Sequence, residues 1–312
     1  MYAHQVIEDF KKSKEHFESL GFGKNALDRL TNTVSGCMMF NIDDIDGLID
    51  NFSKPCFIES PYINGYKRYL KLPFDRCWID WSGSNKRHEY NNVVASAAIV
   101  VESHGMIMVD FFKKLSGYMF APSISTWIFS LSGNFNEEQV DEIIKNIGNG
   151  ETSRNELLSM KHLGYTHQKD EMISKYGIEQ TDDLLSKERQ AMIRINLILQ
   201  SFMLLLNCKN ISTKKNYPPE ALNKKRIKQG KQPLFTYHTL VINPISEKRR
   251  NDGPHEATGI KQRLHFCRGH FKEYTDSNKL FGKYTGMYWW QPMVRGNKEL
   301  GIVHKNYQIK AA

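Results

Sequence analysis

The sequence is poor in cysteine and has no long apolar segment. Its five cysteines are scattered through 312 residues without a C-x-x-C pair, a pattern that predicts reduced thiols in a cytoplasm and argues against a zinc site. No apolar run approaches the ~20 residues that a membrane-spanning helix needs, and the Met1 end has no charged segment followed by an apolar leader. We therefore expect a cytoplasmic protein that does not cross a membrane.

The standard motifs of catalysis and cofactor binding are also missing. The chain has no G-x-x-x-x-G-K-[ST] phosphate loop, no H-E-x-x-H, no nucleophile elbow and no G-x-G-x-x-G after a strand. Four acids lie in or beside predicted strands, as the Mg²⁺ ligands of a nuclease do, but their spacing matches no nuclease motif: Asp75, Asp80, Glu102 and Asp110. We expect no metal and no cofactor, and if the chain is an enzyme at all, we expect an RNA endonuclease.

Positive charge is concentrated in the last third of the chain. The whole chain carries +9, but residues 201–312 hold 21 Lys and Arg against seven Asp and Glu, whereas residues 1–200 hold 22 against 27. An acidic part followed by a basic part predicts two kinds of partner, because basic surfaces most often bind polyanions. A solvated lysine-rich surface is the alternative.

Periodicity predicts an α+β fold, with a mostly antiparallel sheet flanked by helices and a basic β-rich C-terminal module. Helical spacing and helix start and stop signals favour helices at His4–Leu20, Asn41–Phe52, Asn136–Ile147, Asp170–Tyr176 and Thr181–Asn207. Runs of β-branched and aromatic residues favour strands at Cys77–Trp81, Val93–Glu102, Met106–Phe112, Ser125–Leu131 and Phe235–Ile242, with a tight turn at His104-Gly105. The apolar end of the Thr181–Asn207 helix should pack on the sheet. The composition changes after it, so we predict a domain at 1–207 and a basic, aromatic-rich module at 208–312.

Two segments of that module are candidates for nucleic-acid binding. Lys209–Lys231 carries eight basic residues against Glu220 alone, and Pro218-Pro219 and Gly230 favour a helix between them. Lys261–Gly296 interleaves basic residues with large rings, which suits a ligand with phosphates and bases. The candidate nucleic-acid-binding residues of both segments are Lys224, Lys225, Arg226, Lys228, Lys231, Arg268 and Lys272, and the candidate aromatic surface is Phe271, Tyr274, Trp289 and Trp290. The core of a β-rich module would need the same aromatic residues.

His265 and His270 are the candidate catalytic pair, because a metal-free ribonuclease needs two histidines as general base and general acid. Five residues apart, they face opposite sides of a regular strand, and they converge only if the strand is bulged between them, for which Gly269 is the most favourable place. Structural hydrogen bonds from Arg268 and His270 are the alternative that we favour.

Several runs of the sequence resemble one known family. They are RLHFCRGHFKEY and YWWQPMVRG in the aromatic segment, LLLNCKNI and LNKKRIKQGKQPLFTYHTL before it, and LPFDRCWIDW in the predicted sheet. Together they resemble the type V-A anti-CRISPR family of phage and mobile-element proteins, which block production of the type V CRISPR effector nuclease. The resemblance implies recognition of the nascent N-terminal peptide of the effector in the host bacterial cytoplasm, followed by loss of the translated mRNA.

The charge distribution fits that implication, since a protein at a translating ribosome needs one surface for a peptide and another for RNA or ribosome. We therefore expect a counter-defence protein that lowers expression of a CRISPR effector. A metal-independent ribonuclease and a nucleic-acid-binding accessory protein of phage replication are the alternatives.

Overall fold

The computed structural model describes residues 2–15, 25–43, 67–72, 74–82, 93–115, 117, 119–131, 134–147, 154–159, 162–166, 169–245, 263–267, 269–291 and 293–302. Two compact units make up the chain. Unit 1 comprises Met1–Leu206 and Thr213–Val241, and unit 2 comprises Asn207–Ser212 and Ile242–Ala312. The basic segment at 213–241 thus belongs to unit 1, whereas the predicted boundary followed residue 207, because the strands on both sides of its helix join the large sheet.

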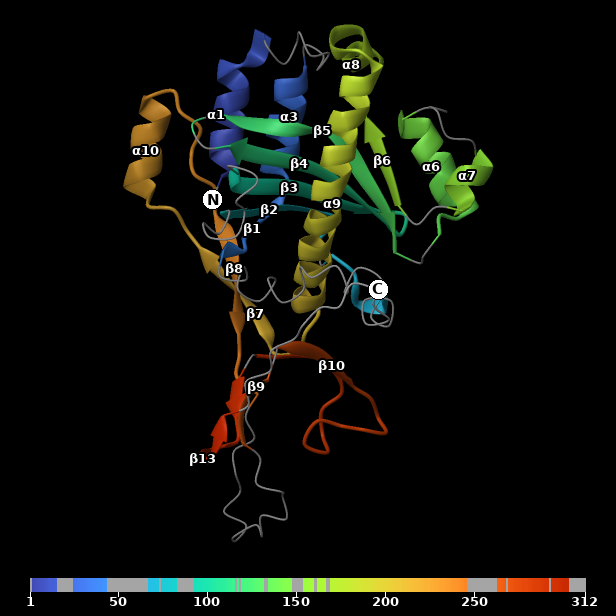
Figure 1. The fold of residues 1–312 in the computed structure, drawn as a ribbon. Helices are drawn as coiled ribbons and strands as arrows, with labels where there is room; N and C mark the ends of the chain where they lie inside the picture. The colour runs from blue at the N-terminus through green and yellow to red at the C-terminus, as the bar shows by residue number, and fades with distance from the viewer. Residues whose placement is uncertain are drawn as a thin grey trace. The chain divides into compact units, whose positions relative to one another are not determined.

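The large sheet contains eight strands in the order β6-β5-β4-β3-β2-β1-β8-β7 (Figure 1). The strands are β1 Met38–Asn41, β2 Arg76–Ser82, β3 Val93–Ser103, β4 Met106–Leu115, β5 Phe120–Ser130, β6 His162–Thr166, β7 Ile211–Asn216 and β8 Tyr237–Ile242. β2 to β6 pair antiparallel in chain order, whereas β1 runs parallel to both β2 and β8. The α+β prediction is confirmed, and the parallel pairs make the sheet mixed.

Local sequence signals account for the central hairpin. β3 and β4 are rich in β-branched and aromatic residues, and the turn between them places His104 and Gly105 at φ 50° and 69°. Positive φ at both central positions is the conformation that matches the twist of a two-residue hairpin. The helix predicted from Asn41 is wrong at its start, because Asn41 ends β1 and pairs with Asp80 of β2; residues 44–52 lie outside the described part.

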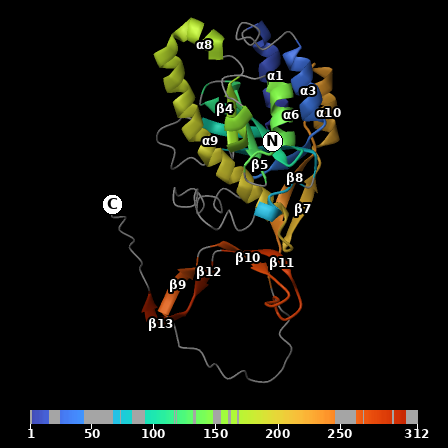
Figure 2. The same ribbon diagram turned by 90° about the vertical axis from the view of Figure 1, so that its right-hand side faces the viewer.

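Helices cover both faces of the sheet. They are α1 Ala3–Lys12, α3 Ala26–Ser35, α6 Glu137–Ile147, α7 Arg154–Ser159, α8 Lys169–Tyr176, α9 Ile178–Leu206 and α10 Glu220–Lys228, with a 3-10 turn η3 at Lys67–Tyr69. In Figure 2, α9 lies on one side of the sheet and α1 and α3 lie on the other. None of the helices in the described ranges is long and apolar enough to cross a bilayer.

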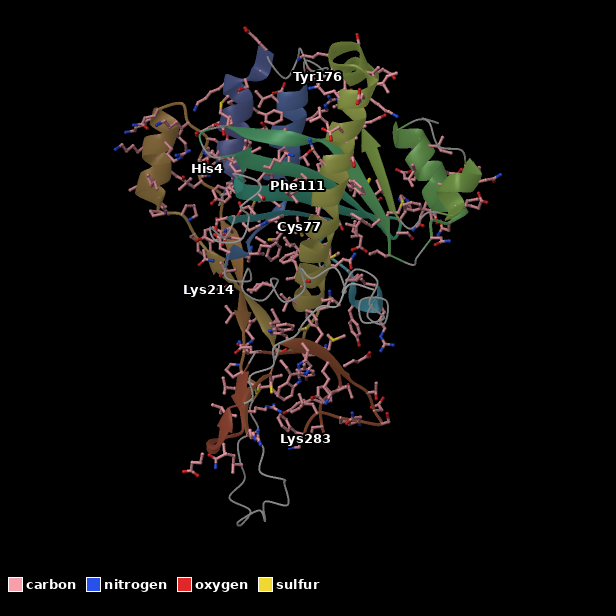
Figure 3. All side chains as sticks on the ribbon, in the orientation of Figure 1. His4, Cys77, Phe111, Tyr176, Lys214 and Lys283 are labelled. Atoms are coloured by element: carbon pink, nitrogen blue, oxygen red, sulfur yellow. The ribbon has the colours of Figure 1, made fainter. Side chains whose placement is uncertain are left out.

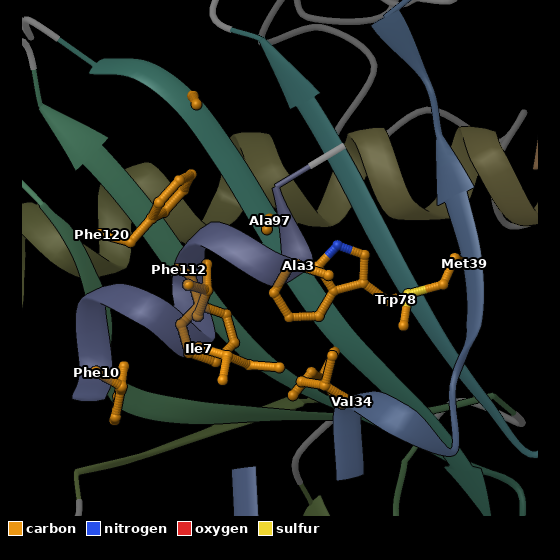
Figure 4. Close-up of a cluster of buried hydrophobic side chains, with 12 residues drawn as sticks. Ala3, Ile7, Phe10, Val34, Met39, Trp78, Ala97, Phe112 and Phe120 are labelled. Carbon is orange, nitrogen blue, oxygen red and sulfur yellow. The ribbon is translucent and has the colours of Figure 1, made fainter. Parts of the chain in front are cut away.

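The core of unit 1 confirms this layering. Ile7 of α1 and Val34 of α3 pack against Trp78 and Phe112 on one face (Figure 4). On the other face the ring of Phe202, from the apolar end of α9, contacts Phe40 at a centroid distance of 5.1 Å. The prediction that this end of α9 packs on the sheet is therefore confirmed.

Unit 2 is built from short strands. They are β9 Arg263–Cys267, β10 His270–Tyr274, β11 Gly286–Trp290, β12 Met293–Arg295 and β13 Asn297–Ile302. β10 and β11 form an antiparallel hairpin, and β9 lies between β12 and β13 in a separate three-stranded sheet. Clustered charges with Gly and Pro predict an exposed loop at Ser246–Gly259, and this segment lies outside the described residues.

Candidate nucleic-acid interface

Helix α10 is attached to unit 1 by polar side chains, because no residue of the helix is buried. Arg226 donates from Nη2 to Glu8 Oε1 of α1 at 2.7 Å and from Nε to the Gln232 carbonyl at 2.8 Å. Asn223, one turn earlier, exchanges two hydrogen bonds with the backbone of Leu234. Arg226 is thus engaged in holding the helix, unlike the lysines predicted beside it.

Four of the predicted residues are exposed on and just after this helix, and we call them the α10 lysines: Lys224, Lys225, Lys228 and Lys231. Glu220, 3.9 Å from Lys224 Nζ, is the one acid that pairs with them in the described part of the chain. An exposed i,i+4 pair contributes only ~0.3–0.5 kcal/mol, so it does not neutralise the helix. The helix therefore presents a cationic surface suited to a polyanion.

Strand β7 extends this cationic character to the edge of the sheet. It is the last strand in the order, and residues 212–215 are all exposed. They include Lys215 and Lys214, which is labelled in Figure 3. Lys215 Nζ lies 5.1 Å from the ring centroid of Tyr217, which is 72% exposed. Sequence analysis did not predict this strand, since its run of polar residues lacks the alternation of a half-buried strand; the Lys-Lys pair was the available signal.

The predicted aromatic surface of unit 2 is wrong for three of its four residues. Phe271, Tyr274 and Trp289 are 2%, 6% and 1% exposed. Phe271 and Trp289 are buried on one side of the hairpin, as Met287 is, and Tyr274 is buried on the other side. Phe271 and Trp289 are cross-strand partners with ring centroids 4.7 Å apart, so they face the same side of the hairpin. Burial of these rings supplies the apolar core that such a small unit requires.

The side chain of an asparagine forms two hydrogen bonds with the backbone of β11 in this core. Asn210 donates from Nδ2 to the Trp289 carbonyl at 2.8 Å, and its Oδ1 accepts the Trp289 N–H at 2.9 Å. The Lys209 N–H adds a bond to the Met287 carbonyl at 2.8 Å. The hairpin edge is thus satisfied by the 207–212 segment, which explains why these residues belong to unit 2.

The opposite side of the hairpin carries a lysine and tyrosines. Lys272, Tyr288 and the half-buried Trp290 share this side in the strand register. Lys272 Nζ lies 4.8 Å from the Tyr274 ring centroid, and the Tyr274 and Tyr288 rings meet edge to face at 5.7 Å. Burial first, and then the neighbouring Tyr284 and Tyr274 hydroxyls, raise the pKa of Tyr288. A cluster of phenols with a cation over one ring thus covers this side.

The candidate catalytic histidines lie on different sheets. His265 is in β9 opposite Arg295 of β12, and the exposed His270 begins β10 opposite Trp290. The catalytic prediction required one bulged strand that contains both histidines, and the structure does not form such a strand. The side chain of His265 and the whole of Arg268 lie outside the described residues.

The acids of the sheet have structural partners. The buried Asp80 accepts from Trp78 Nε1 at 2.9 Å and from Asn41 Nδ2 at 3.1 Å, and burial raises its pKa. Glu102 accepts the Leu72 N–H at 2.8 Å, and Asp110 accepts from Thr126 Oγ1. Across the ranges that the structure describes, no three His, Cys, Asp or Glu side chains gather as metal ligands would.

The thiols of Cys37, just before β1, and Cys77, in β2, are not activated nucleophiles. Burial raises the pKa of Cys37 to about 11 and that of Cys77 to about 12, so both stay protonated near neutral pH. Comparisons with protein-family models, with curated proteins and with solved structures found no match.

Proposed function

We propose that this chain is a counter-defence protein that recognises a CRISPR effector polypeptide as it emerges from the ribosome and lowers its expression, with loss of the translated mRNA. The proposal rests on the resemblance carried by the Arg-Gly-His and Trp-Gln-Pro runs of unit 2. The protein would act in the cytoplasm of a bacterial cell, which contains the effector, the ribosome and the mRNA.

The structural observation that supports it most is the exposed edge strand β7, which the cationic helix α10 follows in the chain. An edge strand offers backbone donors and acceptors to an extended chain, and that is how many proteins take up a peptide before it has folded. Lysines on an edge strand also prevent it from pairing with a second copy of the chain. The α10 lysines supply the second contact, to RNA or ribosome.

Two weak contacts suffice for such a mechanism. Once the α10 lysines hold the ribosome or message, peptide binding becomes an intramolecular event with a raised effective concentration. The peptide contact then provides the specificity, and the cationic contact provides residence near the translating complex, because phosphate contacts carry no sequence information themselves.

Two reporters test the proposal. In the first, the opening codons of a susceptible effector are recoded synonymously, so that the RNA changes and the peptide does not. In the second, compensated frameshifts change the peptide and leave the RNA nearly intact. Repression should survive the first change and disappear with the second. The opposite pattern would transfer specificity to RNA and refute peptide recognition.

A further inference from the structure

We propose that the turn Leu280–Tyr284 in unit 2 is a binding site for single-stranded nucleic acid, in which Phe281 and Tyr284 stack on bases. Lysines around the turn contact the phosphates. The inference deepens the proposed function, since a message lies close to any translating ribosome, but the binding itself does not depend on peptide recognition.

The turn has a well-defined backbone. The Leu280 carbonyl accepts from the N–H groups of Lys283 and Tyr284 at 3.1 and 3.0 Å, and the Leu280 N–H donates to the Tyr284 carbonyl at 2.8 Å. Leu280 itself is buried in the core of unit 2 and anchors the turn. Phe281 and Gly282 occupy the tip with φ of 52° and 69°.

Phe281 is an unusual residue for its position. Two consecutive positive φ values favour Asn-Gly, because a bulky side chain there meets the backbone. Phe281 is nevertheless 37% exposed, so more than a third of this large apolar residue is open to a ligand. Residues held at unfavourable φ cluster at active sites and ligand-binding positions.

The surroundings of Phe281 match one ligand chemistry. Tyr284 is 54% exposed and lies close enough to Tyr288 to affect its pKa. Lys283 is exposed at the tip (Figure 3), and within the described residues no acid pairs with it. Lys279 holds Asp276 at 3.2 Å but is 39% exposed, and Lys272 lies on the same hairpin. Rings and cations alternate along the turn.

Single-stranded nucleic acid fits this alternation better than the other polyanions. Its bases are unstacked and present a π-face to an aromatic side chain, while its phosphates meet lysines. A duplex hides its base faces, and an acidic peptide would use the lysines without the rings. The rings contact no feature unique to ribose, so we expect oligouridine and oligodeoxythymidine to bind with similar affinity.

Fluorescence anisotropy with the full chain and a labelled oligouridine tests the site. Phe281→Gly suits the positive φ, so the variant should fold, and it should bind roughly tenfold more weakly. Tyr284→Leu should weaken binding similarly. The matched control is Tyr176→Leu, which removes another exposed ring with a lysine over it, Lys175 Nζ at 5.2 Å, and should leave affinity unchanged.

Three further measurements fix the chemistry. A strand of equal length that lacks bases should bind roughly tenfold more weakly than oligouridine, and 2-aminopurine in the strand should be quenched on binding. The series is repeated with the α10 lysines changed to glutamate, so that binding at α10 cannot mask the turn.

The inference is overturned if folded Phe281→Gly binds oligouridine as wild type does, if the strand without bases binds equally well, or if polyglutamate of equal charge competes equally. These outcomes are separate from those of the reporters. If Phe281→Gly loses oligouridine binding and repression does not depend on the peptide sequence, the binding site is supported and the proposed function is refuted.

Discussion

Removal of the Arg226 guanidinium should make local opening of α10 more frequent without unfolding the chain. In Arg226→Met, Glu8 loses a charged partner at 2.7 Å and keeps the Gln232 N–H at 3.1 Å. The two side chains are 17% and 23% exposed, so the pair lies between a surface ion pair and a buried one. Surface pairs contribute up to ~1 kcal/mol and breaking a buried pair costs ~3–5 kcal/mol, so we expect a loss of about 2 kcal/mol.

Because α10 has no buried residue, that loss should appear as local opening of the helix. About 2 kcal/mol corresponds to roughly 30-fold faster amide exchange, which hydrogen–deuterium exchange mass spectrometry measures on peptides covering α10. Lys225→Met is the matched control, since it removes an exposed cation from the same helix, and its exchange should equal that of wild type. Equal protection in Arg226→Met and Lys225→Met would refute the structural role of Arg226.

The remaining predictions concern binding, catalysis and pH. Changing the α10 lysines to glutamate should abolish RNA binding at α10, and the slope of log affinity against log salt at this site should be roughly −3 for four phosphates; a salt-insensitive interaction would contradict this. If His270 makes a structural hydrogen bond, as we favour, His270→Ala should lower the free energy of unfolding by about 1 kcal/mol, whereas a ~10²-fold loss of RNA cleavage in a folded variant would make His270 catalytic. Burial, and then the charge of Arg226, lower the pKa of His4 to about 4. The unfolded chain binds the His4 proton at higher pH, so the contribution of His4 to the free energy of unfolding should be complete above pH ~6.5 and should fall as the pH decreases towards 4. Urea unfolding of wild type and His4→Phe should show that difference, and parallel pH profiles would contradict it.

Short-range patterns predicted most of unit 1. The strands β2 to β5 follow from runs of β-branched and aromatic residues, and the His104-Gly105 turn follows from its tolerance of positive φ. β7 escaped prediction because its polar residues become a strand only by pairing with β8 in the sheet. β1 was predicted as the start of a helix, since four residues between two parallel partners carry too little local signal.

The roles of several candidate residues could not be predicted from the sequence, because they depend on contacts between residues that are distant in the chain. Arg226 was grouped with neighbouring lysines because its partner Glu8 is 218 residues away in the sequence. The burial of Phe271 and Trp289 depends on the register of β10 with β11, which the composition of the segment does not reveal. Phe281 was visible in the sequence as an aromatic residue, but its positive φ and its exposure come only from the fold.

Purification of the tagged chain from translating cells tests the central claim most directly. The account predicts that the mRNA of a susceptible effector is recovered with the chain, and that puromycin, which releases the nascent peptide from the ribosome, abolishes this recovery. Changing the α10 lysines to glutamate should reduce the recovered mRNA and preserve the preference for that message. Equal recovery of the message after puromycin would contradict recognition of the emerging polypeptide.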